Sequence, residues 1–405
     1  MRVALVNTYE RAGGAARAAY RLYGALREDG VEATLVTVQS LPALPARLLM
    51  TADRVRRRIK LAPYSIQGGY EAFQVDDPWL GRLLHPYLGD SEVVNLHWVA
   101  GLLDFARLPQ LAAKAPVVWT LHDMLAFTGG CHYDDSSEGF LRGCGSCPQL
   151  GSGSPHDLSR GAFERKRAAY AAVPAHRLHF VAPSQWLARE VTRSPLAGRF
   201  GVSVIPNSLE LSVFRPGDRA EARATLGLPH DRFIVLFMAQ DLVNRRKGMA
   251  SLQAALSRLQ GLPQVLLVSA GKTAGAADGP AVRHLGFVAD DARLATLFRA
   301  ADVFVLPSLQ DNLPNTMLES LACGTPVVGF AVGGIPDLVR HGQSGLLAPP
   351  GDAGALAEAI RVMAGDPARA RAMGARGREL VAAACAPAVQ AAAYRMLFAD
   401  MKGRA

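Results

Sequence analysis

The chain alternates short apolar runs with longer segments whose apolar residues recur at helical spacing. Such runs predict buried strands of a parallel sheet, and segments such as Ala15 to Leu26 predict the helices between them. The strands expected in a first series are Val3 to Val6, Ala33 to Val36, Val93 to Leu96, Val117 to Leu121 and Leu178 to Val181. Those expected in a second series are Ile234 to Met238, Gln264 to Ser269, Val303 to Leu306 and Val327 to Phe330.

Between the two series the pattern breaks into a polar connection that begins near Val204 and runs through Pro216. Each series predicts one α/β domain with a doubly wound parallel sheet, in which ligands bind at the carboxyl ends of the strands. We therefore expect an N-terminal domain over residues 1–206 and a second domain over residues 207–380. The alanine-rich end, Asp352 to Ala405, is predicted to form helices interrupted at Pro387.

Composition limits the function classes. With 405 residues and 50% hydrophobic content, the chain can bury the cores of two domains. Lys and Arg number 44 against 35 Asp and Glu, and the net charge of +9 suits anionic ligands or membrane surfaces. An aromatic content of 7%, without a groove-reading motif, does not indicate nucleic-acid binding. Five cysteines and no export signal predict a reducing cytoplasm, and no apolar run approaches the length of a membrane span.

The most informative stretch follows the predicted strand Val303 to Leu306. A polar loop carrying Asp311 and Asn312 leads to Pro314, which we place in the first turn of a helix. The backbone N–H groups of residues 315–317 and the helix dipole would then face the loop, which is the arrangement of an anion site.

Two carboxylates flank this predicted anion site. Asp311 projects from the loop, and Glu319 falls one turn into the helix. A phosphorylated, hydroxyl-rich ligand fits between them, although the same spacing also fits acids that only cap the helix start.

A cationic segment, Asn244-Arg245-Arg246-Lys247-Gly248, follows the predicted strand that ends at Met238. Three cations after a strand end can neutralise a diphosphate, since Arg offers paired donors and Lys a point charge. An exposed charge run is the alternative.

The first domain offers two further candidates at strand ends. Gly13 and Gly14 let the backbone approach a ligand at the start of a helix, but the pattern is not Gly-x-Gly-x-x-Gly and does not favour a nicotinamide cofactor. A simple tight turn is the alternative.

His122, beside Asp123, is placed to hydrogen-bond a sugar hydroxyl, and His97 is a weaker candidate for the same role. The same pattern also fits a histidine that only forms hydrogen bonds within the protein.

Asp311-x7-Glu319, followed by Ala322-Cys323-Gly324-Thr325-Pro326 and Gly333-Gly334-Ile335-Pro336-Asp337, resembles the Glu-x7-Glu motif of family 4 glycosyltransferases. The resemblance covers nearly the whole chain and is strongest from Pro307 to Leu347. It implies the GT-B fold, in which two Rossmann-like domains face a central cleft and the last helix, here within residues 381–405, crosses back to the first domain.

The resemblance also implies roles for residues. Lys247, with Arg246, would bind the diphosphate of a nucleotide sugar, and Glu319 would contact the ribose hydroxyls. Asp311 stands at the first acidic position, which touches the donor sugar, although it is shorter than the Glu of the motif. His122 and the loop at Gly13 and Gly14 would face sugar and acceptor. The amides expected to hold the diphosphate belong to Asn312, Leu313, Asn315 and Thr316.

A cysteine-bearing loop follows His122. Cys131, His132, Cys144 and Cys147 could supply four zinc ligands, but a second Cys-x-x-Cys pair is missing, and reduced cysteines are the alternative. The segment from His122 to Cys131 resembles a loop of bacterial exopolysaccharide glycosyltransferases of the colanic-acid type.

The expected activity is therefore retaining transfer of a sugar from a UDP- or GDP-sugar to a saccharide or lipid-linked acceptor in envelope or exopolysaccharide synthesis, with no metal or other cofactor required. A sugar-nucleotide epimerase, a phosphorylase or a non-catalytic sugar-nucleotide binding protein on the same architecture is the alternative.

The segment Arg47 to Lys60 places Leu48, Val55 and Ile59 on one helical face among cations. This pattern fits peripheral association with the inner face of a membrane, or a solvated helix on its own domain.

Overall fold

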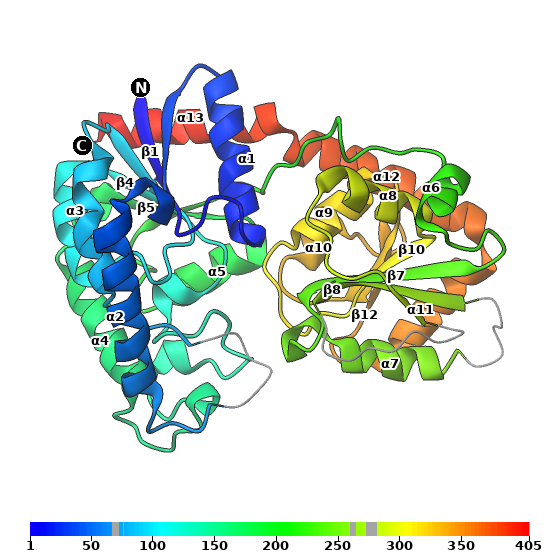
Figure 1. Ribbon diagram of the computed structural model, residues 1–405, viewed down its shortest axis with the longest axis horizontal. Helices are drawn as coiled ribbons and strands as arrows, with labels where there is room; N and C mark the ends of the chain where they lie inside the picture. Colours follow the sequence, from blue (N-terminus) through cyan, green and yellow to red (C-terminus); the bar gives the residue numbers. More distant parts are fainter. Residues whose placement is uncertain (67–72, 76, 260–264, 273–281, 405) are drawn as a thin grey trace. The chain divides into compact units, whose positions relative to one another are not determined.

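The computed structural model describes residues 1–66, 73–75, 77–259, 265–272 and 282–404, and the chain forms two compact units (Figure 1). Unit 1 comprises Met1–Asn207 and Pro387–Ala405, and unit 2 comprises Ser208–Ala386. The expected boundary at residue 206 lies next to the observed one. The boundary expected at residue 380 differs, because helix α12 (Pro367–Cys385) buries Val381 and Cys385 in the core of unit 2 and the chain leaves at the extended residue Ala386.

In the described part of unit 1, six parallel strands lie in the order β2-β1-β3-β4-β5-β6. The strands are β1 (Arg2–Val6), β2 (Glu32–Val36), β3 (Val93–Leu96), β4 (Val117–Thr120), β5 (Leu178–Ala182) and β6 (Gly201–Val204). The helices are α1 (Gly14–Glu28), α2 (Ala43–Leu61), α3 (Leu108–Lys114), α4 (Leu158–Ala171), α5 (Gln185–Arg193) and α13 (Pro387–Gly403). The strand order reverses between β1 and β3, so the topological switch point lies at the carboxyl ends of these two strands.

The sheet of unit 1 is buried on both faces, which explains its continuous apolar strands. Successive side chains of a strand point to opposite faces. Val3 and Leu5 therefore join a cluster with residues of α1 and α13, whereas Ala4 and Val6 join the larger cluster under α3, α4 and α5. The final helix, α13, thus completes one face of the sheet to which the first strand belongs.

Unit 2 repeats this plan, with six parallel strands in its described part in the order β12-β11-β10-β7-β8-β9. The strands are β7 (Phe233–Asp241), β8 (Val265–Lys272), β9 (Val282–His284), β10 (Val303–Leu306), β11 (Val327–Phe330) and β12 (Gly345–Ala348). The helices are α6 (Arg219–Leu226), α7 (Met249–Ser257), α8 (Asp291–Ala300), α9 (Asn315–Ala322), α10 (Ile335–Leu338), α11 (Ala353–Gly365) and α12. Its switch point lies at the carboxyl ends of β7 and β10.

The predicted elements are present, with a few differences. Strands β6, β9 and β12 were not predicted, and Gln264 lies outside the described residues. Pro314 precedes α9 as its N-cap rather than lying in the first turn, because its ψ of 122° is extended. These differences leave the two doubly wound sheets as predicted.

The C-terminal segment corrects one sequence-based expectation. Residues 367–403 are long and apolar enough, by length and composition alone, to cross a membrane, although no such run was expected. In the structure the segment is interrupted at Ala386, whose ψ is 141°. Val381 and Cys385 before the break pack in unit 2, and Tyr394 and Phe398 after it pack in unit 1, so the segment forms two helices that each bury one face in a core.

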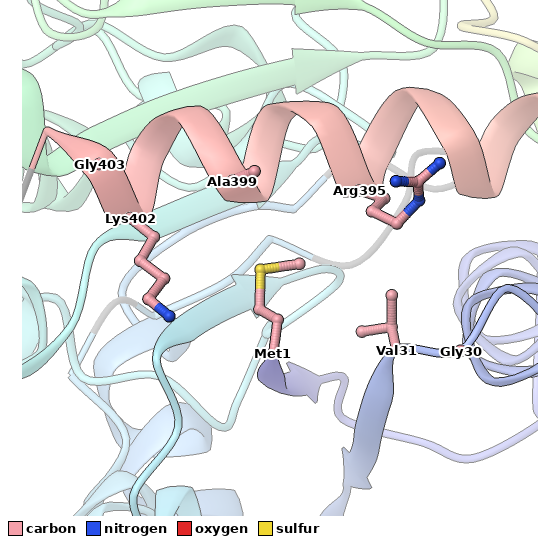
Figure 2. Close-up of a pocket in the computed structure, with 7 residues that line it drawn as sticks. All are labelled: Met1, Gly30, Val31, Arg395, Ala399, Lys402 and Gly403. Carbon is pink, nitrogen blue, oxygen red and sulfur yellow. The ribbon is translucent and has the colours of Figure 1, made fainter.

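A shallow pocket of about 460 Å³ lies at the amino end of the unit 1 sheet (Figure 2). Arg395 and Lys402 line it from α13, and Met1 lines it from the start of the chain. Arg395 pairs with Asp29 at 2.7 Å and Lys402 with Glu92 at 2.5 Å. These cations are neutralised, and the pocket lies opposite the carboxyl ends of the strands, where ligands bind in such folds.

Candidate functional site

The loops that follow β7 and β10 bring two cations and a carboxylate together at the switch point of unit 2. Nζ of Lys247 donates to Oδ2 of Asp311 at 2.6 Å, and Nη1 of Arg246 lies 3.2 Å from the same oxygen. Arg246 also donates to the carbonyl of Gln310 at 2.9 Å. The predicted diphosphate-binding residues and the first acidic position therefore form one cluster, although 64 residues separate Lys247 from Asp311.

This cluster keeps Asp311 ionised. The residue is only 5% exposed, and burial alone would raise the pKa of its carboxyl group. The charges of Lys247 and Arg246, with hydrogen bonds from Lys247 and from Ser308, outweigh burial and hold the pKa below its ordinary value. The carboxylate therefore holds both cations in the loop region through its Oδ2.

Two glycines allow the loops to approach so closely. Gly248 has a φ of 74°, and a Cβ there would lie 1.8 Å from the carbonyl oxygen of Pro307. Gly333 has a φ of 56°, and a Cβ there would lie 1.6 Å from the carbonyl oxygen of Asp311. No residue with a side chain fits either position without moving the loop that carries Asp311.

Helix α9 begins beside this cluster, with one correction to its predicted donors. The N–H of Met317 donates to the carbonyl of Pro314 at 3.0 Å, because the first turn closes on the N-cap, so Met317 is not an anion donor. Asn315 and Thr316 begin the helix and are both partly buried. Asn312 and Leu313, in the preceding loop, are buried, and Glu319 is buried one turn into the helix at 1% exposure.

Many members of the resembled family have an arginine where this chain has Gln240, and Arg245 or Arg246 could compensate for it. Arg246 reaches Asp311, whereas Arg245 is exposed. Asn244 fixes this segment, because its side chain accepts a hydrogen bond from the N–H of Arg246 at 3.0 Å. Arg246 is thus the arginine that the fold brings to the cluster.

In unit 1, the glycine pair lies where the sequence places it, at the start of α1. Gly13 is the N-cap residue with a φ of 93°, and its carbonyl accepts from the N–H of Arg17 at 3.1 Å. Gly14 is the first helical residue. The positive φ of Gly13 turns the chain from the end of β1 into α1 at the switch point of this sheet.

His122 lies just beyond the end of β4 and is partly buried. Its ring stacks on that of His97 with 5.3 Å between centroids, and Nε2 lies 3.1 Å from Nδ1 of His97. Burial lowers the pKa of His122 to about 4, partly offset by the charge of Asp123, so the ring is neutral near pH 7. His97 is only 3% exposed, and both of its ring nitrogens face protein atoms, Nδ1 toward His122 and Nε2 toward Asn95.

Asp123 organises the loop next to His122. Its Oδ2 accepts from Nε1 of Trp98 at 2.8 Å and lies 2.6 Å from Nδ1 of His132, and its Oδ1 accepts from the N–H of Leu125. Burial alone would raise the pKa of Asp123, but the interactions with His132 outweigh it and lower the pKa. Asp123 is therefore an ionised anchor for the loop. Sequence reasoning noted it only as a neighbour of His122.

Buried Lys166 of α4 supports the same loop and was also missed. Its Nζ donates to the carbonyls of Leu125 and Thr128 at 2.6 and 2.9 Å. A lysine within an otherwise amphipathic helix gives no sequence signal for such a role, since most lysines are exposed.

The four weak metal-ligand candidates do not form a metal site in the described part of the chain. No group of three or more His, Cys, Asp or Glu side chains there is arranged to hold an ion. His132 is turned to Asp123, and Sγ of Cys144 accepts from the N–H of Gly129 at 3.2 Å. Burial raises the pKa of Cys131, Cys144 and Cys147, which keeps these thiols protonated.

Comparison with known sequences places both units in one enzyme family. Residues 12–213 match the model described as Glycosyltransferase Family 4, and residues 232–366 match the one described as Glycosyl transferases group 1. D-inositol 3-phosphate glycosyltransferase 1 of Catenulispora acidiphila is 30% identical over 370 residues, which are 85% of this chain and 81% of that protein. D-inositol 3-phosphate glycosyltransferase of Mycobacterium bovis is 37% identical over 187 residues, only 43% of this chain and 38% of that protein.

Solved structures show the same fold. Sucrose-phosphate synthase from Thermosynechococcus elongatus superposes with a TM-score of 0.69 at 23% identity, covering 98% of this chain and 99% of that one. Anabaena Alr3699/HepE in complex with UDP-glucose gives a TM-score of 0.65 at 18% identity, with coverage of 98% and 99%. The fold is GT-B. The chain belongs to the family 4 glycosyltransferases, and the protein is a glycosyltransferase enzyme.

Proposed function

We propose that this glycosyltransferase moves a sugar from a UDP- or GDP-sugar to a hydroxyl of a saccharide or lipid-linked acceptor in envelope or exopolysaccharide synthesis. The observation that carries the proposal is the pair of cations, Arg246 and Lys247, held at the switch point of unit 2 near the start of α9. Two adjacent cations can bind the diphosphate of a nucleotide sugar. The UDP-glucose bound by HepE supports this donor class, and the inositol phosphate named for the relatives supports a hydroxyl-rich acceptor.

In the proposed reaction, Lys247 and Arg246 offset the charge that develops on the leaving diphosphate, without a divalent metal. Asn312, Leu313, Asn315 and Thr316 line the phosphate side of the loop and helix start. The chain has no Asp-x-Asp motif with which to hold a cation for the phosphates. Configuration is retained, because the acceptor attacks from the face of the leaving group.

The remaining site residues bind and orient the substrates. Glu319 would bind the ribose hydroxyls, and Asp311 would hold the two cations and meet the donor sugar when it arrives. Neutral His122 would accept a hydrogen bond from a sugar hydroxyl rather than serve as a base, since its pKa of about 4 is low. The glycine turn at Gly13 and Gly14 leaves room for the acceptor.

Two experiments test the activity. Thermal shift with UDP, GDP, ADP and dTDP identifies the nucleotide, since a ligand that binds the folded protein raises its Tm. Transfer is then measured with the matching nucleotide sugars and an acceptor panel that includes inositol phosphates and lipid-linked sugars, in excess chelator, and NMR assigns the anomer. Retained configuration in chelator supports the proposal. An inverted anomer, or activity that requires added magnesium, contradicts the mechanism.

The same assays separate the competing activities. Turnover without an acceptor would indicate an epimerase, and dependence on inorganic phosphate would indicate a phosphorylase. Tight nucleotide binding with no transfer across the panel would indicate a binding protein.

We also propose that α2 docks on an anionic membrane at the cytoplasmic face. Leu48 and Ile59 are 63% and 66% exposed, and Leu44 and Val55 share this solvent face with Arg47, Arg54 and Arg58. No acidic residue of α2 is exposed, since Asp53 is partly buried and accepts from the N–H groups of Trp79 and Leu80. Apolar side chains interleaved with arginines fit the interface of an anionic bilayer.

Not all of the cations in this segment are available for lipid. Arg56 and Lys60, which the sequence placed with the other charges, pair with Asp77 at 2.9 and 2.8 Å.

The free cysteines are consistent with a reducing cytoplasm as the place of action, since Cys131, Cys144, Cys147, Cys323 and Cys385 form no disulfide.

A further inference from the structure

A buried chain of hydrogen bonds in unit 1 connects the C-terminal helix to His122. It runs from Tyr394 of α13 through Thr120 and Asn95 to His97, and from His97 to His122. Asn95, Thr120 and His97 are all buried in the sheet region, where polar groups must be paired. The donor and the acceptor of each hydrogen bond in this series can be assigned one by one, because the series includes a backbone carbonyl that can only accept.

The orientation of Asn95 is fixed by that carbonyl. The carbonyl oxygen of Val118 lies 3.0 Å from one terminal atom of the Asn95 side chain, which must therefore be the amide nitrogen. The same nitrogen donates to Oγ1 of Thr120 at 3.0 Å. The amide oxygen is left facing Nε2 of His97 at 2.9 Å.

The orientation of Asn95 fixes the tautomer of His97. An amide oxygen only accepts, so Nε2 of His97 carries a hydrogen. Burial, reinforced by the proximity of His122, holds the pKa of His97 well below 6.5, so the ring is neutral and its Nδ1 is an acceptor.

His97 in turn determines His122. Nδ1 of His97 accepts across 3.1 Å, so Nε2 of His122 must donate. In a neutral imidazole the other nitrogen, Nδ1, then carries no hydrogen. Within the described residues, Nδ1 of His122 has no hydrogen-bond partner, and His122 remains partly exposed at the carboxyl end of β4.

We propose that Asn95 and His97 are positioning residues that hold His122 in the Nε2–H tautomer, so that its Nδ1 presents only an acceptor to a bound ligand. The ligand group that meets His122 must then be a hydrogen-bond donor, such as a hydroxyl, and a carbonyl or carboxylate oxygen is excluded. This specificity rests on the proposed transfer to and from sugars, in which that group is a sugar hydroxyl. A histidine without a fixed partner could accept or donate and would not make this selection.

The tautomer is tested by nitrogen NMR on protein labelled only at its histidines, with the His122 resonances assigned from the His122→Gln variant. We expect a hydrogen-bearing Nε2 and a hydrogen-free Nδ1 at His122 in the wild type, and a mixture of tautomers in Asn95→Leu. Tyr394→Phe is the matched control. It removes a hydroxyl from the same chain but leaves the carbonyl of Val118 to orient Asn95, so the tautomer should not change. A wild-type His122 protonated at Nδ1 would overturn the proposal even if no variant folds.

The consequence for the ligand is tested by kinetics with donor sugars in which fluorine replaces one hydroxyl at a time, since fluorine cannot donate. At one ring position, fluorine should lower kcat/KM about tenfold more in the wild type than in His122→Ala, the effect of one lost hydrogen bond. Asn95→Leu, with its mixture of tautomers, should lie between the wild type and His122→Ala, and Tyr394→Phe should behave like the wild type. Equal losses in all four proteins at every position would overturn the selection. Absence of any transfer would reject the proposed function, while NMR would still decide the tautomer.

Discussion

Lys247 and Asp311 are joined by a 2.6 Å ion pair that links the loop after β7 to the loop after β10. The pair lies where the strand order of unit 2 reverses, with Arg246 beside the same carboxylate oxygen. The proposed diphosphate would meet cations already extended and held in place there, so little side-chain entropy would be lost on binding. On this proposal the diphosphate would also compete with Asp311 for those cations.

Removal of the lysine is expected to weaken nucleotide binding. Lys247→Ala deletes a charged hydrogen bond worth about 1.5 to 3 kcal/mol, so the Kd for the nucleoside diphosphate should rise roughly tenfold to a hundredfold. Glu319→Ala should also weaken binding, through loss of the proposed ribose contact. Calorimetry gives the affinities, and Arg245→Ala is the control, because Arg245 is exposed in the same cationic segment. Unchanged affinity in folded Lys247→Ala and Glu319→Ala would contradict the site assignment.

Neutralising the carboxylate should separate binding from transfer. Asp311→Asn leaves Lys247 and Arg246 without their anion, so both cations become available to the diphosphate, and nucleotide affinity should be maintained or increased. The kcat of transfer should fall, because the cations lose the group that orients them. A loss of nucleotide affinity comparable to that of Lys247→Ala would show that Asp311 does not compete with the ligand.

The close approach at Gly333 gives a steric prediction. Gly333→Ala would place a methyl group 1.6 Å from the carbonyl oxygen of Asp311, so the loop must move, and nucleotide affinity should fall about tenfold or more. Gly342→Ala is the matched control, since Gly342 also has a positive φ, of 78°, but a methyl group there would meet nothing within 4 Å. It should cost about 1 kcal/mol of stability and leave affinity unchanged. Similar affinities for the two variants would argue against a tight loop contact.

The two stacked histidines predict loss of stability in mild acid. Burial lowers the pKa of His122 from 6.5 to about 4, and lowers that of His97 as well, so the unfolded chain takes up protons first. The free energy of unfolding should therefore be greatest above pH 6.5 and fall as the pH decreases toward 4. Thermal unfolding from pH 7.5 to pH 4.5 measures this, and His97→Gln should reduce the dependence. His156→Gln, an exposed control, should retain the wild-type slope. A pH dependence that is the same in both variants would exclude the histidine pair as its source.

The solvent face of α2 predicts association with anionic lipid. In a flotation assay, the wild type should rise with vesicles of phosphatidylglycerol and phosphatidylcholine and not with phosphatidylcholine alone. The variant with Arg47, Arg54 and Arg58 changed to Gln should lose binding, as should one with Leu48 and Ile59 changed to Ser. Arg56→Gln is the control within the same helix, because Arg56 is paired with Asp77. Binding that survives both sets of changes would eliminate α2 as the membrane contact.

The strands that the sequence predicted and those that it missed differ in their place in the sheets. The central strands, such as Val303–Leu306, are buried on both faces and therefore continuously apolar. The three missed strands, β6, β9 and β12, are all at sheet edges. β6 and β9 are mostly half-buried, so selection for apolar residues is weak. β12 contains Gly345, which is required because a Cβ there would lie 2.2 Å from the carbonyl oxygen of Val327.

Sequence patterns identified single residues of the candidate site better than the partners of those residues. The charge of Lys247 and the spacing of Asp311 were visible, but their pairing depends on which strands become neighbours. The buried network of Asn95 and His97 could be predicted from the sequence only in part. Their spacing of two, repeated by Thr120 and His122 on the adjacent strand, places polar side chains on one face of a sheet and could have indicated a buried network.

The position of α13 has a consequence for the synthesis of the chain. Tyr394 and Phe398 cover one face of the sheet that contains β1, yet they are translated after all of unit 2. The first unit to leave the ribosome must therefore wait, with that face covered only by α1, until Pro387–Ala405 emerges. During elongation the part of this surface that α13 covers is open to aggregation or to chaperones, and unit 1 is completed only after all of unit 2 has been synthesised.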